Sequence, residues 1–210
     1  MSDTFTGGPI ELFDVAGREQ LIALLEHGLV PTSVVADIGC GALRGGRWII
    51  PLLEAGHYCG VEPNQAMVDR GLREFVDADI ARLKSPRFSF NSDFDLSEFD
   101  VLFTHVLMRS IWTHCSKQQI EKSLDAVVRF GSPDVVLLTS VVKPSRNPFS
   151  AKSDYKGDSW VGRSHESDVP GVVAHSFPWL RKACRTRGLS MAHWRRRPVN
   201  DQIWLRITRS

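Results

Sequence analysis

The chain has few cysteines, and no two of them form a C-x-x-C pair. The four cysteines stand alone, at positions 40, 59, 115 and 184 of the 210 residues. Scattered cysteines of this kind usually serve as small buried apolar side chains in a reducing compartment. A disulfide framework is therefore excluded as the basis of the fold.

Long apolar runs are absent as well. No uninterrupted apolar stretch approaches the length of about 18 residues that a membrane-spanning helix needs. The first residues, MSDTFTGGPIELFD, contain neither the basic segment nor the apolar segment of a secretory leader. We therefore expect a soluble cytoplasmic protein with no membrane partner.

Ligand spacings typical of metal sites, such as H-x-x-x-H, are also missing, so we expect no metal. What is present is an ordinary globular composition, with 42% hydrophobic and 24% charged residues and a net charge of +2. A chain of this length forms one sizeable core and is too short for two full domains. We predict a single domain over residues 1–210.

Helical and strand patterns alternate along the chain, which is typical of an α/β fold with a mostly parallel sheet and helices on both faces. The predicted helices span residues 15–26, 45–53, 65–75, 117–130 and 177–187, and the predicted strands span 34–38, 58–62, 87–90, 99–107, 135–142, 190–195 and 202–208. Asn64 is the expected N-cap of the third helix.

The most informative segment is VVADIGCGALRGG, from Val34 to Gly46. A β-branched run ends on Asp37 and passes into a turn containing Gly39 and Gly41, which lack a Cβ and allow a ligand to lie against the backbone. The dinucleotide fingerprint G-x-G-x-x-G would need a third glycine where this chain has Arg44. The pattern therefore favours a nucleotide-like cofactor other than a nicotinamide dinucleotide.

A second landmark, HYCGVEPN, predicts a short strand that ends at Glu62, 25 residues after Asp37. This spacing is close to that of a βαβ unit whose second strand presents a carboxylate to a ribose diol. Both acids could instead only cap strand ends and bind no ligand.

Together these segments resemble motif I and the ribose-binding acid of the class I S-adenosylmethionine (SAM) dependent methyltransferases. The LRGG continuation is similar to a bacterial group of small methyltransferase domains. The resemblance implies a Rossmann-like seven-stranded sheet, mostly parallel, with an antiparallel edge strand formed by the final hairpin. It also implies SAM as the cofactor and a cofactor site made of Asp37, Gly39, Cys40, Gly41, Arg44, Glu62, Pro63, Asp93 and Thr104.

Two of these roles are open. Arg44 is placed to reach the carboxylate of the methionine moiety, but Arg18 could do this instead, and Arg44 could simply pack along the next helix. Asp93, assigned by resemblance to the adenine amino group, could equally be a turn residue.

The segment FTHVLMRSIWTH, at the fourth strand, supplies the catalytic candidates His105 and His114. A histidine near its usual pKa can accept a proton at neutral pH, and His105 lies where methyltransferases place residues that face the methyl donor. We predict that His105 positions the acceptor or acts as general base. Each histidine could instead be a buried, hydrogen-bonded side chain at a strand end.

Residues 143–178 have no clean periodicity and are rich in Pro, Ser, Gly and Asp. A connection of this length is uncommon unless it is functional or disordered. Its large amphipathic side chains, Tyr155, Trp160, His165 and His175, suit a lid that closes on a small organic acceptor. The segment could also be an exposed, partly disordered insertion whose aromatic residues pack on the sheet edge.

We therefore predict a SAM-dependent methyltransferase that acts on O, N or C of a small molecule. Residues 181–210 contain nine Lys or Arg and one acid, which suits a nucleic-acid methyltransferase. Basic side chains on an edge strand also prevent aggregation, so we do not expect a nucleic-acid partner. A nicotinamide oxidoreductase would share the fold, although the missing Tyr-x-x-x-Lys pair argues against it, and a SAM-binding protein without methyl transfer would share both fold and cofactor site. The sequence predicts no oligomeric state.

Overall fold

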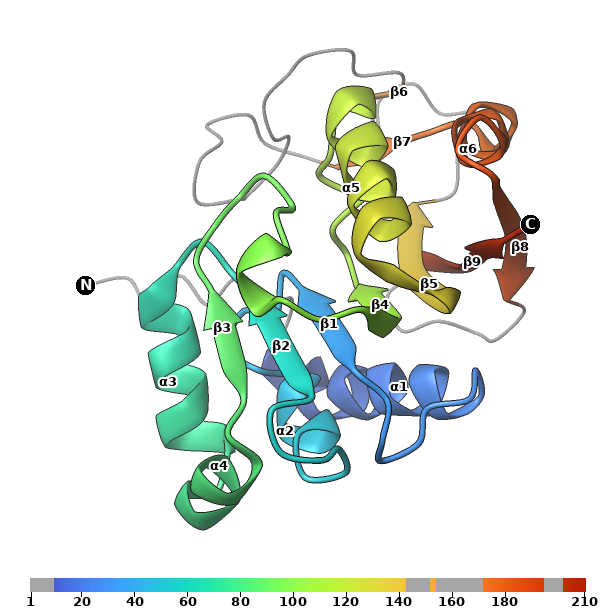
Figure 1. Cartoon of the computed structure of the whole chain (residues 1–210). Helices are drawn as coiled ribbons and strands as arrows, with labels where there is room; N and C mark the ends of the chain where they lie inside the picture. The colour runs from blue at the N-terminus through green and yellow to red at the C-terminus, as the bar shows by residue number, and fades with distance from the viewer. Residues whose placement is uncertain (1–9, 143–151, 154–171, 195–201) are drawn as a thin grey trace.

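The computed structural model describes residues 10–142, 152–153, 172–194 and 202–210, and its core is a seven-stranded sheet (Figure 1). The strands are β1 (Val35–Ile38), β2 (Tyr58–Val61), β3 (Arg87–Ser89), β4 (Phe103–Met108), β5 (Gly131–Val142), β8 (Leu189–Trp194) and β9 (Gln202–Arg209), in the order β3-β2-β1-β4-β5-β9-β8. A separate two-stranded sheet pairs β6 (Lys152–Ser153) with β7 (Val173–Ala174).

Helices cover the sheet on both sides. They are α1 (Phe13–Leu25), α2 (Gly46–Ile49), α3 (Gln65–Phe75), α4 (Ala78–Lys84), α5 (Lys117–Phe130) and α6 (Phe177–Arg185), with short 3-10 helices at Ile10–Leu12 and Ser97–Phe99. The first five strands of the sheet pair in parallel, and β9 pairs antiparallel with both β5 and β8. The predicted fold class is confirmed. The antiparallel strand is β9, which lies between β5 and the edge strand β8.

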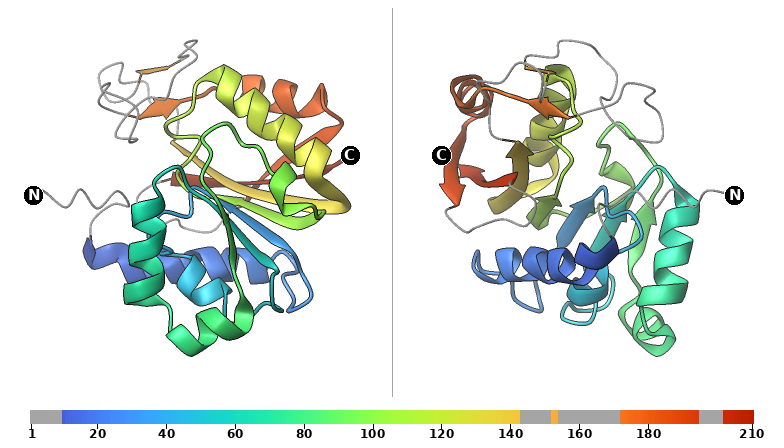
Figure 2. Two further views of the ribbon diagram at one scale, coloured as in Figure 1. Left: turned by 60° about the vertical axis from the view of Figure 1, so that its left-hand side comes forward. Right: turned by 180° about the vertical axis from the view of Figure 1, so that it is seen from behind.

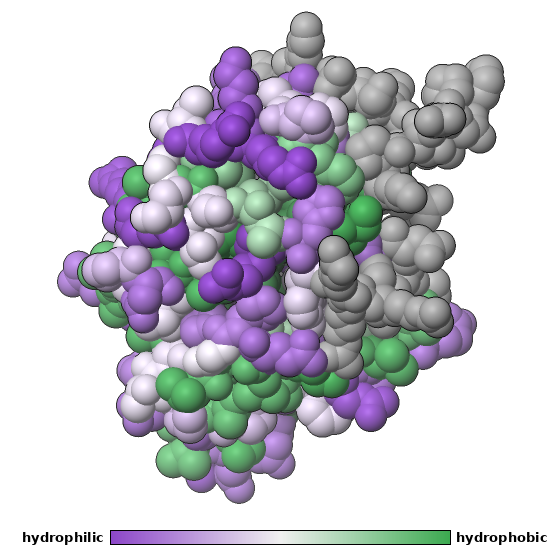
Figure 3. All heavy atoms as spheres, turned by 90° about the vertical axis from the view of Figure 1, so that its right-hand side faces the viewer, coloured by the Kyte–Doolittle hydropathy of each residue, from purple (hydrophilic) through white to green (hydrophobic). Residues whose placement is uncertain are grey.

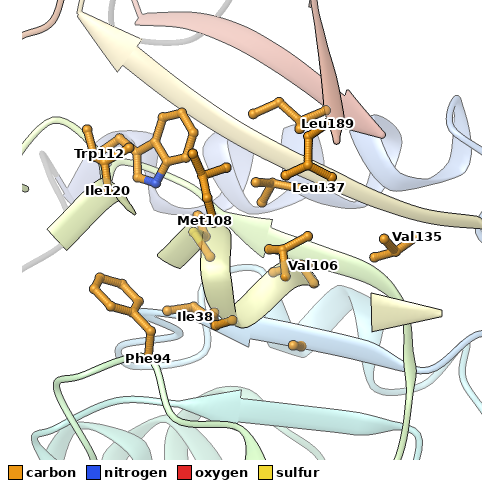
Figure 4. Packing of buried hydrophobic residues seen from close by; sticks show 14 of the residues in the cluster. Ile38, Phe94, Val106, Met108, Trp112, Ile120, Val135, Leu137 and Leu189 are labelled. Carbon is orange, nitrogen blue, oxygen red and sulfur yellow. The ribbon is translucent and has the colours of Figure 1, made fainter. Parts of the chain in front are cut away.

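Helices lie on both faces of the sheet (Figure 2), and one apolar cluster forms the core on each face. On one face, α1, α2 and α3 contribute Leu24, Ile49 and Val68. On the other, α5 contributes Ile120, which lies near Trp112 in the cluster of Figure 4. Burial of apolar surface on both faces explains why the central strands are almost wholly apolar.

The element boundaries largely follow the sequence pattern. Helices α3 and α5 begin and end where predicted, and the side chain of Asn64 accepts a hydrogen bond from the amide of Met67 as the N-cap of α3. Other predicted bounds were wrong. Helix α2 ends at Ile49 instead of residue 53, and β5 begins at Gly131 instead of residue 135. Helix α4, which buries none of its residues, was not predicted, and β4 begins at Phe103 instead of residue 99, because residues 97–99 form a 3-10 turn that ends on Asp100 with φ of 50°.

The register of the parallel strands places the carboxyl ends of β1, β2 and β4 close together. Asp37 on β1 pairs with Gly60 on β2 and with Leu107 on β4. The residues that follow β1, β2 and β4 therefore emerge along the same edge, where ligands bind in open α/β sheets. Among the described residues, no helix is long and apolar enough to cross a membrane, and no group of three or more His, Cys, Asp or Glu could hold a metal.

Candidate functional site

The loop after β1 runs through two glycines in the left-handed conformation. Gly39 and Gly41 have φ angles of +74° and +54°, which glycine adopts without strain. The amide of Gly39 donates a 2.7 Å hydrogen bond to the carbonyl of Val61 at the end of β2. A Cβ at Gly39 would lie 2.1 Å from Cδ1 of Ile111, a residue of the loop after β4. A side chain at position 39 would therefore have to displace the end of Ile111 and adopt a strained backbone conformation.

Asp37 lies one residue before the end of β1 and is 3% exposed. Its Oδ2 accepts a 2.6 Å hydrogen bond from the hydroxyl of Tyr58 on β2. Burial raises the pKa of Asp37 from its ordinary value of 3.8 to about 6, although the Tyr58 hydrogen bond and the positive charge of Arg44 oppose the rise. The negative charge of Glu62 adds to it. The carboxyl group is therefore poised between its charged and neutral forms just below neutral pH.

Glu62 directly follows β2 and is also buried. Its Oε2 accepts a 3.1 Å hydrogen bond from the amide of Gly41, and its Oε1 accepts one of the same length from the amide of Asn64. Each oxygen of a carboxylate can accept more than one hydrogen bond, so Glu62 is an acceptor of the type that binds ligand hydroxyls. Asp37 and Glu62 thus flank the glycine loop, as predicted.

Arg44 lies in the turn that leads into α2 and is partly buried. Burial and the nearby charge of Arg109 lower its pKa to about 10, while Asp37 and Glu19 act in the opposite direction. Arg18, the other candidate for a ligand carboxylate, forms a 3.0 Å ion pair with Asp14 on the exposed side of α1. The structure thus associates Arg44, rather than Arg18, with the acids of the site.

The predictions for His105 and Thr104 were wrong. Both residues lie near the amino end of β4, where His105 pairs with Val35 at the start of β1. The Nε2 of His105 donates a 3.2 Å hydrogen bond to the carbonyl of His27, and Thr104 Oγ1 bonds to the backbone of Val34. Because the carboxyl end of β4 is Met108, neither side chain is at the edge where a ligand would bind.

Arg109, which was not among the predicted residues, stands where His105 was expected. Its side chain is 3% exposed, and Nη2 lies 3.3 Å from Oε2 of Glu19 on α1. Its Nη1 donates to Oγ of Ser140 on β5 at 3.0 Å and to Oε1 of Gln202 on β9. The next residue, Ser110, has a φ of 63° and donates its backbone amide to Ser140. A buried ion pair and a left-handed non-glycine residue thus occupy the carboxyl end of β4.

Trp204 completes this polar cluster. Its Nε1 donates a 3.2 Å hydrogen bond to Oε1 of Glu19, and the guanidinium of Arg109 lies 5.1 Å from the centre of its ring. Glu19 therefore binds two partners from distant parts of the chain, which joins α1 to β4 and β9. No local sequence signal marks Glu19, because its partners lie in distant segments of the chain.

The other predicted cofactor residues follow β1, β2 and β3. Cys40 is buried in the glycine loop, and burial raises the pKa of its thiol well above the usual range. Pro63 is exposed after Glu62. Asp93 is exposed in the loop after β3 and its Oδ1 accepts a 3.4 Å hydrogen bond from the amide of Asp95, so it has the geometry of a turn residue. Contact of these residues with a cofactor stays a prediction.

The remaining candidates lie after β4 or in the segment 143–178. His114 is partly exposed in the loop after β4, and its catalytic role stays a prediction. His175 is 1% exposed, and its Nε2 donates a 2.8 Å hydrogen bond to the carbonyl of Cys115, which joins the end of the predicted lid to that loop. Tyr155, Trp160 and His165 lie outside the described residues.

Comparison with known proteins gives similarity in structure alone. No family model matches the sequence, and no curated protein matches it. A SAM-dependent methyltransferase from Clostridium acetobutylicum ATCC 824 superposes with a TM-score of 0.68 at 13% identity, covering 94% of this chain and 92% of the other. The DhpI–SAH complex gives 0.66 at 15% identity, covering 97% and 88%. Magnesium protoporphyrin IX methyltransferase (ChlM) from Synechocystis PCC 6803 with bound SAM gives 0.63 at 16% identity, covering 98% and 88%.

The fold is therefore the Rossmann-like fold of these methyltransferases, and it extends over nearly the whole chain. At such low identity the similarity establishes the fold and leaves the chemistry to be argued from the site itself.

Proposed function

We propose that the protein is a SAM-dependent methyltransferase that acts on a small-molecule acceptor. The observation that carries the proposal is the pair of buried carboxylates, Asp37 and Glu62, at neighbouring strand ends on either side of the glycine loop. Burying two acids this close is costly unless a ligand or a fixed set of donors uses them. The solved structures with this fold include proteins with SAM or SAH bound, which supports the same cofactor here.

The residues present fit such a cofactor. Glu62 presents two carboxylate oxygens beside the glycine loop, which suits a diol, and Asp37 is an acid that suits an amine or hydroxyl. Arg44 supplies a cation for a carboxylate beside these acids. When bound, SAM would supply a methyl group already activated by its sulfonium. The chain's own task is then to orient the acceptor and exclude water, so positioning matters more than acid–base work.

A small acceptor is favoured over a nucleic acid by the way the C-terminal basic residues are used. Arg187 forms a 2.6 Å ion pair with Asp125, and Arg209 donates to backbone carbonyls of Val128, Gly131 and Ser132. These two side chains stabilise the fold rather than offering a free phosphate-binding surface. On the face that carries α6 and β8, hydrophilic residues are interspersed with apolar ones (Figure 3).

Isothermal titration calorimetry with SAM and with NAD tests the cofactor. We expect binding of SAM and none of NAD, and Glu62→Gln should weaken SAM binding at least about tenfold because a charged acceptor is lost. Glu54→Gln, at an exposed position, is the matched control and should bind as the wild type does. Binding of NAD instead of SAM would reject the proposal.

The acceptor requires a second experiment. Incubation with metabolite pools and SAM should yield S-adenosylhomocysteine together with a methylated product, whereas a SAM-binding protein without transfer activity would yield neither. The roles predicted for His114 and for the segment 143–178, including Tyr155, Trp160, His165 and His175, belong to this part of the proposal. Variants at these positions should change the affinity for the acceptor more than the affinity for SAM.

A further inference from the structure

Tyr58 is a buried side chain that the proposed function does not by itself use. It is 1% exposed at the start of β2, and its ring lies 6.1 Å from that of Phe88 at an angle of 63°. A tyrosine in such a position could be replaced by phenylalanine if packing were its only role. Its hydroxyl, however, donates a 2.6 Å hydrogen bond to Asp37, which is short for a neutral donor and typical of one bound to an ionised carboxylate.

The local structure makes room for this hydroxyl. A Cβ at Gly46, the first residue of α2, would lie 2.7 Å from the Tyr58 oxygen. The LRGG continuation of the loop therefore allows the start of α2 to close over the Tyr58–Asp37 pair. This arrangement keeps water away from the pair and fixes the hydroxyl in place.

The charged and titratable groups around Asp37 come from three directions. Arg44, in the loop before α2, favours the ionised carboxylate, and Glu62, after β2, disfavours it. The Cys40 thiol lies in the glycine loop, where burial raises its pKa well above the usual range and so keeps it neutral. Among the described residues, the Tyr58 hydroxyl is the one hydrogen-bond donor to the Asp37 side chain.

We propose that Tyr58 is a positioning residue, whose hydroxyl holds the Asp37 carboxylate ionised and oriented beside the glycine loop so that it can bind the cofactor. The inference rests on the proposed function for the cofactor but concerns residues of this chain alone. Its consequence is a defined pH dependence. Without the hydroxyl, Asp37 would take up a proton at a higher pH, because a hydrogen bond to the charged form would be lost while the burial remained.

Tyr58→Phe tests the proposal by calorimetry with SAM between pH 5.5 and 8.5. We expect the ratio of the variant's Kd to that of the wild type to be about tenfold at pH 6, because loss of the hydrogen bond leaves less of Asp37 ionised there. At pH 8.5 Asp37 is ionised in both proteins, so the ratio should fall within about twofold. The amino group of SAM titrates in the same way for both proteins and cancels from the ratio. A ratio that is the same at every pH would show a purely structural role and overturn the proposal.

Two further variants keep the test decisive. Ser123→Ala removes the buried hydrogen bond from Trp112 on the far face of the sheet, and its Kd ratio should not vary with pH. If Tyr58→Phe does not fold at pH 7, we expect it to fold at pH 5, and we expect Asp37→Asn to restore its folding at pH 7. Failure of both rescues would contradict the proposal.

Failure of the proposed function gives a different result. If the wild type binds no SAM at any pH, urea denaturation of the protein alone still tests the inference. Tyr58→Phe should then lose more stability at pH 8 than at pH 5, because Asp37 is charged only at the higher pH. An equal loss at both pH values would overturn the positioning role regardless of the cofactor.

Discussion

Replacement of Asp37 by asparagine should make the protein more stable at neutral pH while removing its cofactor binding. The wild-type carboxyl group is buried, and burial raises its pKa from 3.8 to about 6. Asparagine has nearly the same shape, and its carbonyl oxygen can still accept the hydrogen bond from Tyr58. The substitution therefore removes a buried charge without leaving a cavity or an unpaired hydroxyl.

The magnitude follows from linkage between protonation and folding. A rise in the pKa of Asp37 from 3.8 to about 6 corresponds to about 3 kcal/mol. For an acid whose pKa is raised by folding, the folded state binds the extra proton, so stability is lost as the pH rises from about 4 to about 6 and stays low above that. Asp37→Asn should avoid this loss and be more stable than the wild type by about 2 to 3 kcal/mol at pH 8, and by only about 1 kcal/mol at pH 4.5.

Urea denaturation followed by tryptophan fluorescence measures both values, because the chain has six tryptophans. Asp69→Asn, at an exposed position of α3, is the control and should change stability by less than about 0.5 kcal/mol at either pH. The reasoning is refuted if Asp37→Asn is less stable than the wild type at pH 8, or if its gain does not shrink on acidification. Such results would mean that the attraction of Arg44 outweighs the cost of burial.

Three more substitutions test the site. Gly39→Ala places a Cβ 2.1 Å from the side chain at position 111, on a backbone with a φ of +74°. We expect a loss of about 1 to 3 kcal/mol in stability and a clear loss of SAM binding. Thermal shift with and without SAM measures both. Glu19→Gln removes the negative charge that faces the buried guanidinium of Arg109, and should lower the free energy of unfolding in urea by about 3 kcal/mol. His105→Gln should leave SAM affinity within about twofold in calorimetry; a large loss would restore His105 to the site.

Much of the fold could be predicted because its signals are local. Helix α3 begins after Asn64, whose side chain caps it, and this pattern lies within a few residues of sequence. The glycine loop and Glu62 were found in the same way, since each lies directly after a short buried strand. Helix α4 was missed because none of its seven residues is buried, so it carries no apolar stripe to detect.

The polar partners of the site could not be predicted, because they are distant from one another in the sequence. Tyr58 lies 21 residues from Asp37, and Glu19 lies 90 residues from Arg109 and 185 from Trp204. These pairs depend on which strands lie side by side and in what register, which no pattern within one segment shows. A buried glutamate or arginine is also indistinguishable in sequence from an exposed one, because only burial reveals that it needs a partner.

The misplacement of His105 shows how a small error along a strand becomes an error in function. His105 is the third residue of β4 and lies three residues before Met108, where the strand ends. A strand rises by about 3.3 Å per residue, so the side chain lies about 10 Å from the edge at which a ligand would bind. The residue type suggested a base, and the structure instead gives it the carbonyl of His27 as a partner. At the true end of the strand, Arg109 and the left-handed Ser110 carry the strain and buried charge that mark functional positions, so acceptor-binding residues are best sought there by mutagenesis.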